Sequence, residues 1–229
     1  MEYNIAGDGS ATPVVNCYLA EGERMITQRG AMAWMTPNIK QETISGSLGR
    51  AFSRLMTGES FFQNVYTAMD APGTITFSSR SPGKIIPVKI STERSMVVQQ
   101  SAFLASEERV RLSIYFQKRL GAGLFGGEGF IMQRLSGDGM AFVEIDGYAQ
   151  AYELAAGQSM IVDTGKLAMM DDTCTMDIRA VKGARNLLFS GDGVFHTVVT
   201  GPGMAVFQSM TIQEMADLLS ASIVQNPKK

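Results

Sequence analysis

Acidic residues recur at matching places in three related segments of this sequence. The segments read LMTGESF at 55–61, LFGGEGF at 124–130 and LFSGDGV at 188–194. Their acids are Glu59, Glu128 and Asp192. Three carboxylates gathered around a common axis could bind a cation or share a proton. The competing interpretation, which we favour, is that each acid accepts backbone N–H bonds within its own turn.

A fourth acid, Asp163, lies in the segment Ile-Val-Asp-Thr-Gly at 161–165, which resembles the signature of aspartic proteases. That chemistry requires two carboxylates that share one proton. The equivalent positions elsewhere are Gln28 and Gln99, so a catalytic pair would need loops from two subunits. The alternative is an Asp at the end of a strand, retained for its local hydrogen bonds.

Other reactive groups are scarce. The only histidine, His196, cannot by itself build a multi-histidine metal site, and a catalytic triad would need it beside a nucleophile. Residues 121–126 match G-x-G-x-x-G, but a strand is expected after them, where a dinucleotide site needs a helix. We therefore predict no catalytic residue, no cofactor and no metal.

The elements that would carry these residues form an internal threefold repeat. Met25, Met96 and Met160 precede the glycines of the three segments (Gly58, Gly127 and Gly191) by 33, 31 and 31 residues. A glycine turn follows each segment, at Gly73, Gly139 and Gly203. Such matched spacing is typical of a repeated architecture.

Period-two patterning predicts that the repeats consist of β-strands. Apolar side chains alternate with others from Val110 to Phe116 and from Cys174 to Ala180. One helix is expected at 211–225, because Thr211 and Glu214 form a capping box ahead of a helically spaced apolar face. The fold class is therefore all-β with one C-terminal amphipathic helix.

The domain organisation expected from the repeat is a single β domain over residues 1–210. Its units cover about 20–87, 88–153 and 154–210, and residues 12–19 are expected to supply a strand that closes the third unit. The ring would then be closed by the ends of the chain, without open sheet edges.

Composition narrows the function classes. A net charge of −2 and scattered basic residues argue against a nucleic-acid partner. Two cysteines, Cys17 and Cys174, make no disulfide framework and are expected to be reduced core residues. The sequence shows no apolar run of membrane-spanning length and no signal peptide, so a cytoplasmic location is expected.

Several motifs together resemble the altered-inheritance-of-mitochondria, or mitochondrial-biogenesis, family over residues 2–210. They are GESFF at 58–62, PGKIIP at 82–87, AFLAS at 102–106, GEGF at 127–130, VDTG at 162–165 and GPG at 201–203. The resemblance implies a shortened double-stranded β-helix repeated three times, as in the TRAP-like fold of the tryptophan RNA-binding attenuation protein. It also implies a homo-oligomer, a trimeric ring, and it supplies no catalytic residues.

Three functions of different class remain open. The favoured one is a non-catalytic oligomeric scaffold or interaction protein with an unidentified protein partner. The second, which rests on fold resemblance, is a ring that binds a small ligand or RNA. The third is a hydrolase that uses carboxylates from several subunits.

Overall fold

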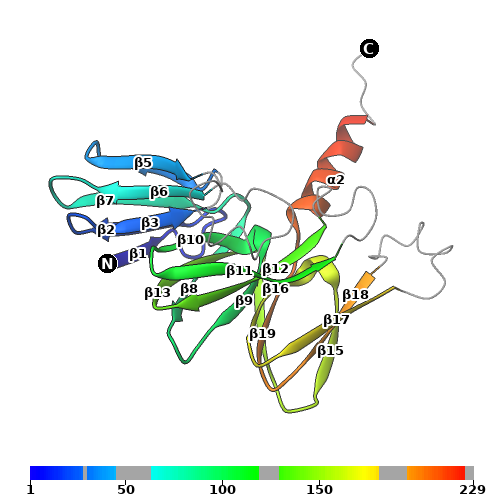
Figure 1. Ribbon diagram of the computed structural model, residues 1–229. Helices are drawn as coiled ribbons and strands as arrows, with labels where there is room; N and C mark the ends of the chain where they lie inside the picture. The colour runs from blue at the N-terminus through cyan, green and yellow to red at the C-terminus, as the bar shows by residue number, and fades with distance from the viewer. Residues whose placement is uncertain (28–29, 45–62, 119–128, 181–194, 225–229) are drawn as a thin grey trace.

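The computed structural model describes residues 1–27, 30–44, 63–118, 129–180 and 195–224, and these form an all-β body with one C-terminal helix (Figure 1). The predicted fold class is confirmed at that level. Glu59, Glu128 and Asp192 lie outside the described residues.

The strands fall into three consecutive sets after a short N-terminal strand, β1 (Glu2–Ala6). The first set is β2 (Val14–Leu19), β3 (Arg24–Thr27), β4 (Met32–Met35), β5 (Ile39–Ile44), β6 (Gln63–Ala68) and β7 (Gly73–Ser78). The second is β8 (Gly83–Ile90), β9 (Met96–Gln99), β10 (Phe103–Glu107), β11 (Val110–Lys118), β12 (Phe130–Gly137) and β13 (Gly139–Asp146). The third is β14 (Ala149–Leu154), β15 (Ser159–Asp163), β16 (Leu167–Asp171), β17 (Thr175–Ala180), β18 (Phe195–Thr200) and β19 (Gly203–Gln208).

Strand pairing follows one scheme in the three sets. The first strand of each set pairs with the last, in the pairs β2–β7, β8–β13 and β14–β19. The second strand pairs with the fifth, and Met25, Met96 and Met160 lie opposite Tyr66, Leu135 and Val199. Two further antiparallel pairs, β3–β10 and β9–β16, join one set to the next.

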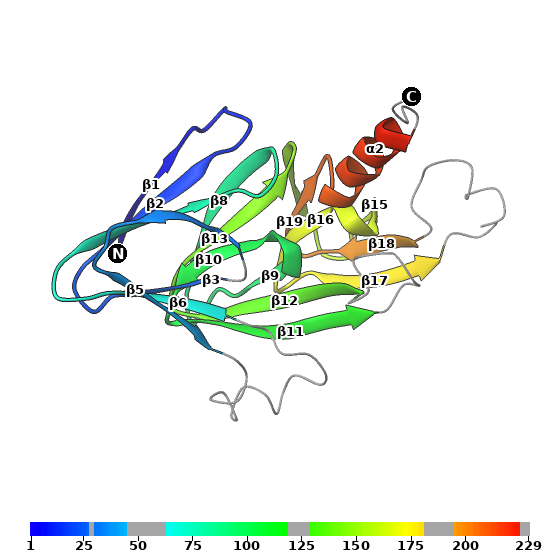
Figure 2. The same ribbon diagram turned by 90° about the horizontal axis from the view of Figure 1, so that it is seen from above.

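Together with the remaining antiparallel pairs, these pairings form four sheets in the described part of the chain. Two have six strands, in the orders β5-β6-β3-β10-β13-β8 and β11-β12-β9-β16-β19-β14. A sheet in the order β1-β2-β7-β4 lies at one end of the molecule and a sheet in the order β15-β18-β17 at the other (Figures 1 and 2). Three clusters of buried apolar side chains hold the sheets together.

The expected closure of the third unit by residues 12–19 is wrong. These residues form β2, which pairs with β7 on one side and with β1 on the other. The last strand of the third set, β19, instead pairs with β14 and β16. The chain therefore does not close on itself through its N-terminal strand.

The three glycine turns are positioned for a contact that the sequence did not reveal. Gly73, Gly139 and Gly203 lie opposite the ends of β2, β8 and β14. The amide of the residue after each glycine donates to an oxygen of an earlier side chain: Thr74 to Thr36 (3.1 Å), Met140 to Glu107 (2.6 Å) and Met204 to Asp171 (2.8 Å). A Cβ on Gly139 or Gly203 would come within 3.1 Å of that acceptor side chain, so glycine is required there.

The C-terminal helix α2 (Ile212–Val224) is attached to the body by its first turn. The predicted capping box is present, because Glu214 N donates to Thr211 Oγ1 (3.1 Å) and Thr211 N to Glu214 Oε2 (2.9 Å). Ile212 N donates to Asp146 Oδ2 (3.0 Å), and Lys166 forms an ion pair with Glu214. Beyond this turn the helix points away from the sheets (Figure 1), so its apolar face does not dock on the β body.

Candidate functional site

Asp163 is the one predicted site residue that the structure describes. It ends β15, and its Oδ1 accepts a hydrogen bond from Gly165 N (3.1 Å), which caps the short 3₁₀ turn Thr164–Lys166. His196 on β18 lies opposite it. This arrangement is the local use of an Asp at a strand end, and it can stabilise the turn without further chemistry.

Metal and thiol chemistry find little support in the described part of the chain. No group of three or more His, Cys, Asp or Glu side chains there could hold a metal ion. Cys17 and Cys174 are free and buried, as expected. Burial raises the pKa of the Cys17 thiol to about 12 and also raises the pKa of Cys174, so both stay protonated at neutral pH and are poor nucleophiles.

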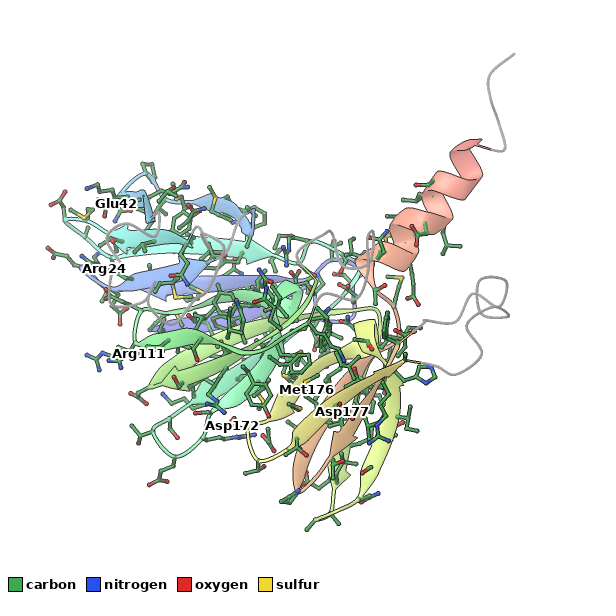
Figure 3. The ribbon with its side chains drawn as sticks, turned by 45° about the vertical axis from the view of Figure 1, so that its right-hand side comes forward. Arg24, Glu42, Arg111, Asp172, Met176 and Asp177 are labelled. Carbon is green, nitrogen blue, oxygen red and sulfur yellow. The ribbon has the colours of Figure 1, made fainter. Side chains whose placement is uncertain are left out.

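Charged side chains are interspersed on the surface that Figure 3 shows. Arg24 and Arg111 point outward from different sets of strands, and Asp172 and Asp177 lie farther along the molecule. Several basic residues are paired, such as Arg24 with Glu108 (2.9 Å) and Arg134 with Asp172 (2.8 Å). A continuous basic surface of the kind that binds polyanions is not formed by these residues.

The feature that distinguishes the two ends of the molecule is a pair of open strand edges. In both six-stranded sheets, the second strand of one set pairs with the third strand of the next set. Among the described strands, β15 is a second strand that lacks this neighbour, and β4 is a third strand that lacks it. Each end sheet therefore carries one side of the junction that the six-stranded sheets contain in full.

Exposure along β15 shows what the missing neighbour would cover. Ile161 is 68% exposed, whereas Val97, at the equivalent position of β9 and opposite Met170 of β16, is fully buried. Met160 is half-buried, while Met25 and Met96 are buried. Ile26, at the equivalent position of β3, is half-buried opposite Ser106 of β10, so Ile161 is the most exposed of the three equivalent side chains.

The same contrast is found on β4. Trp34 is 57% exposed, although its counterparts Ala105 on β10 and Met169 on β16 are buried. Met35 is half-buried, and its counterparts Ser106 and Met170 are buried. Trp34 and Ile161 are thus large apolar side chains on unpaired edges at opposite ends of the chain.

Sequence reasoning missed these two residues, although a signal was present. The repeat aligns Trp34 with Ala105 and Met169, and Ile161 with Ile26 and Val97, which are positions at the junction between sets. An apolar side chain at a junction position of the first or the last set has no neighbouring set to cover it. The sequence prediction of a closed ring left no end set, so these two positions were not expected to be exposed.

No helix in the described residues has the length and apolar character needed to cross a membrane.

Known proteins are similar to this chain over nearly its whole length. A family model described as mitochondrial biogenesis AIM24 matches residues 3–210. An uncharacterised protein of Streptococcus pyogenes serotype M6 is 25% identical over 222 residues, which is 90% of this chain and 85% of the relative. The crystal structure of a Streptococcus pyogenes protein superposes with a TM-score of 0.79 at 22% identity and covers 96% of this chain and 99% of that one.

Proposed function

This chain belongs to the mitochondrial biogenesis AIM24 family, and from that premise we propose that it is a non-catalytic scaffold that assembles with further copies of itself. One observation carries the proposal: the open edges of β15 and β4 are complementary parts of a junction that the chain already makes twice internally. In the assembly, β15 of one copy pairs with β4 of the next.

The internal junctions specify the register of this contact. Met25 lies opposite Glu107 and Met96 opposite Asp171. Glu107 and Asp171 each lie eleven residues after the methionine of their own set, and Thr36 lies eleven residues after Met25. Met160 of one copy is therefore placed opposite Thr36 of the next, and Ile161 opposite Met35.

The contact would also cover both exposed strand edges. An exposed strand edge with large apolar side chains promotes uncontrolled association. Pairing β15 with β4 extends the two end sheets into one and covers both Ile161 and Trp34. The contact joins different surfaces of the two copies, so it produces either a closed ring or an open filament. We propose the closed form, a trimer, as the family resemblance implies.

The three sets of strands are, in this proposal, three copies of one shortened double-stranded β-helix module of the TRAP-like kind. The common pairing scheme supports this. We place the protein in the cytoplasm, which is consistent with its two free, buried cysteines. A non-catalytic role is supported by the local hydrogen bond of Asp163 and the protonated state of the buried thiols.

Disulfide trapping tests the proposed register. In the double variant Met35→Cys/Ile161→Cys, oxidation is expected to link most chains covalently between copies, because directly opposed residues of antiparallel strands are within disulfide reach. Non-reducing electrophoresis and light scattering report the products. The native cysteines are buried and do not compete.

The matched control is Met35→Cys/Val162→Cys. Shifting the second cysteine by one residue turns it to the other face of the sheet, so it should link less than a tenth as much. Equal linking by the two double variants, or a wild-type mass of a single chain in solution, would show that the edges do not pair.

A further inference from the structure

An apolar groove runs between the edges of β8 and β14, and residues 8–10 of the loop after β1 line one end of it. At that end Gly83 N of β8 donates to the carbonyl of Ala11 (2.8 Å), and the β8 edge is open beyond it. The volume of the groove is about 840 Å³. Its floor is formed by Met169, Met204 and Val206 of β16 and β19, and Lys84 and Tyr148 lie at its rim. Met204 and Ile86 are only partly buried and pack against the central core cluster, so the groove opens directly onto core side chains.

The equivalent place between β2 and β8 is filled by β1. This strand pairs antiparallel with the outer edge of β2, with Tyr3 opposite Cys17 and Ile5 opposite Val15. The Tyr3 ring packs edge-on against Phe142 (5.1 Å between ring centres), and Ile5 packs against the same core cluster. Tyr3 is still 37% exposed, and Glu2 and Asn4 on either side of it are exposed as well.

The two places correspond residue by residue. Phe142 and Val206 are each the third residue after the turn glycine of their set, and Met140 and Met204 are each the first. Ala105 corresponds to Met169, and Ile85 to Ala149, through their places in the shared pairing scheme. Strand β1 covers the floor that contains Phe142, whereas the floor that contains Val206 is open along the groove.

We propose that the groove between β8 and β14 binds an extended segment of a partner protein as an added strand on the outer edge of β8. This is strand addition to an open sheet edge, with apolar side chains at alternate positions entering the groove. The inference specifies the partner for the proposed scaffold role, and it does not depend on pairing between β15 and β4.

The chemistry of the partner segment follows from β1. Its apolar residues, Tyr3 and Ile5, occupy alternate positions. The position of Glu2 opposite Tyr18 corresponds to a partner residue opposite Lys89, which is exposed and lies 3.7 Å from Asp138 in a loose ion pair. An acidic residue there is favoured by the cross-strand charge pair. Pro87 on β8 lacks an amide donor, so the added strand is held by the residues on either side of it.

The test uses a fluorescein-labelled synthetic peptide that contains the sequence of residues 1–6, Met-Glu-Tyr-Asn-Ile-Ala, as the probe. Fluorescence anisotropy with the full chain is expected to show saturable binding. Ala151→Trp, which fills the groove from β14, should weaken binding at least tenfold. Gln150→Trp is the matched control: the side chain is exposed on the other face of the same strand, so binding should change less than twofold.

Two further titrations distinguish peptide binding from self-assembly and from binding of any apolar ligand. The titration is repeated with Ile161→Lys, which blocks the β15 edge, and peptide binding should persist whether or not the wild-type chain self-assembles. Decanoate is titrated as an apolar anion that cannot form strand hydrogen bonds. Absence of peptide binding, binding insensitive to Ala151→Trp, or binding of decanoate alone, followed by calorimetry, without any peptide affinity would overturn the proposal.

Discussion

Replacing Gly83 with alanine is expected to destabilise the fold by about 4 kcal/mol or more, in the range reserved for severe backbone conflicts. A Cβ at this position would lie 1.8 Å from the carbonyl oxygen of Ile145 and 2.9 Å from the amide of Gly147. Both are backbone atoms of the strand and turn that face β8, so neither can move without breaking the β8–β13 pairing.

Urea unfolding and thermal melting measure this effect. For a domain of this size each kcal/mol lowers the melting temperature by about 2–4 °C, so a fall of about 8–16 °C is expected. Gly157→Ala is the matched control. Gly157 has a φ of +77° but nothing within 4 Å of the added Cβ, so it should lose only about 1–2 kcal/mol from backbone strain. An equal loss in both variants would contradict the steric explanation.

The matched spacing of the three methionines reflects backbone periodicity within each set of strands. Placing Met25, Met96 and Met160 at equivalent positions agrees with their partners across the second and fifth strands. Alternation also located β17, in which Ile178 is buried, and Cys174 just before it is buried too. Such patterns arise within one strand or one hairpin, where the sequence constrains the geometry directly.

Alternation failed where the strand is irregular. In β11 the register shifts between Ile114 and Phe116, so two successive side chains, Tyr115 and Phe116, both pack partly against the third core cluster. A bulge of this kind inserts a residue without leaving a clear mark in the sequence. The alternation of apolar residues therefore predicted the strand but not the faces of its second half.

Long-range pairing was the part that spacing could not determine. Residues 14–19 have the same offset from Met25 as β8 and β14 have from their methionines, which is equally compatible with pairing inside the first set or across the ends of the chain. In the structure, β7 is the partner of residues 14–19. Separately, β4 and β15 lack a neighbour on one side among the described strands, so the candidate interface emerged from the structure rather than from the predicted acids.

The second large effect is expected at Glu144, whose carboxylate is buried on β13. Arg80 binds it through the backbone amide (2.9 Å) and Nε (2.6 Å), and the guanidinium also donates to the carbonyl of Ser101. Burial raises the pKa of Glu144, and the charge and hydrogen bonds of Arg80 oppose that rise. Arg80→Ala should therefore cost about 3 kcal/mol at pH 7, since it leaves a buried carboxylate without its partner.

The pH dependence has a definite sign. An acid whose pKa is higher in the folded than in the unfolded state favours folding when protonated, so its contribution to stability falls as pH rises above the ordinary carboxyl range. Removing the Arg80 side chain raises the folded-state pKa further and widens this window. The difference in unfolding free energy between wild type and Arg80→Ala should thus be smaller at pH 4.5 than at pH 7.

Two further variants isolate the charge effect. Arg80→Ala/Glu144→Gln carries no buried charge at this site, so it should recover much of the lost stability at pH 7 and lose the added pH dependence. Arg24→Ala breaks the exposed pair with Glu108 and should change stability by less than about 1 kcal/mol. If the Arg80→Ala penalty were the same at both pH values and unaffected by Glu144→Gln, lost packing of the arginine side chain, rather than an unpaired carboxylate, would be its cause.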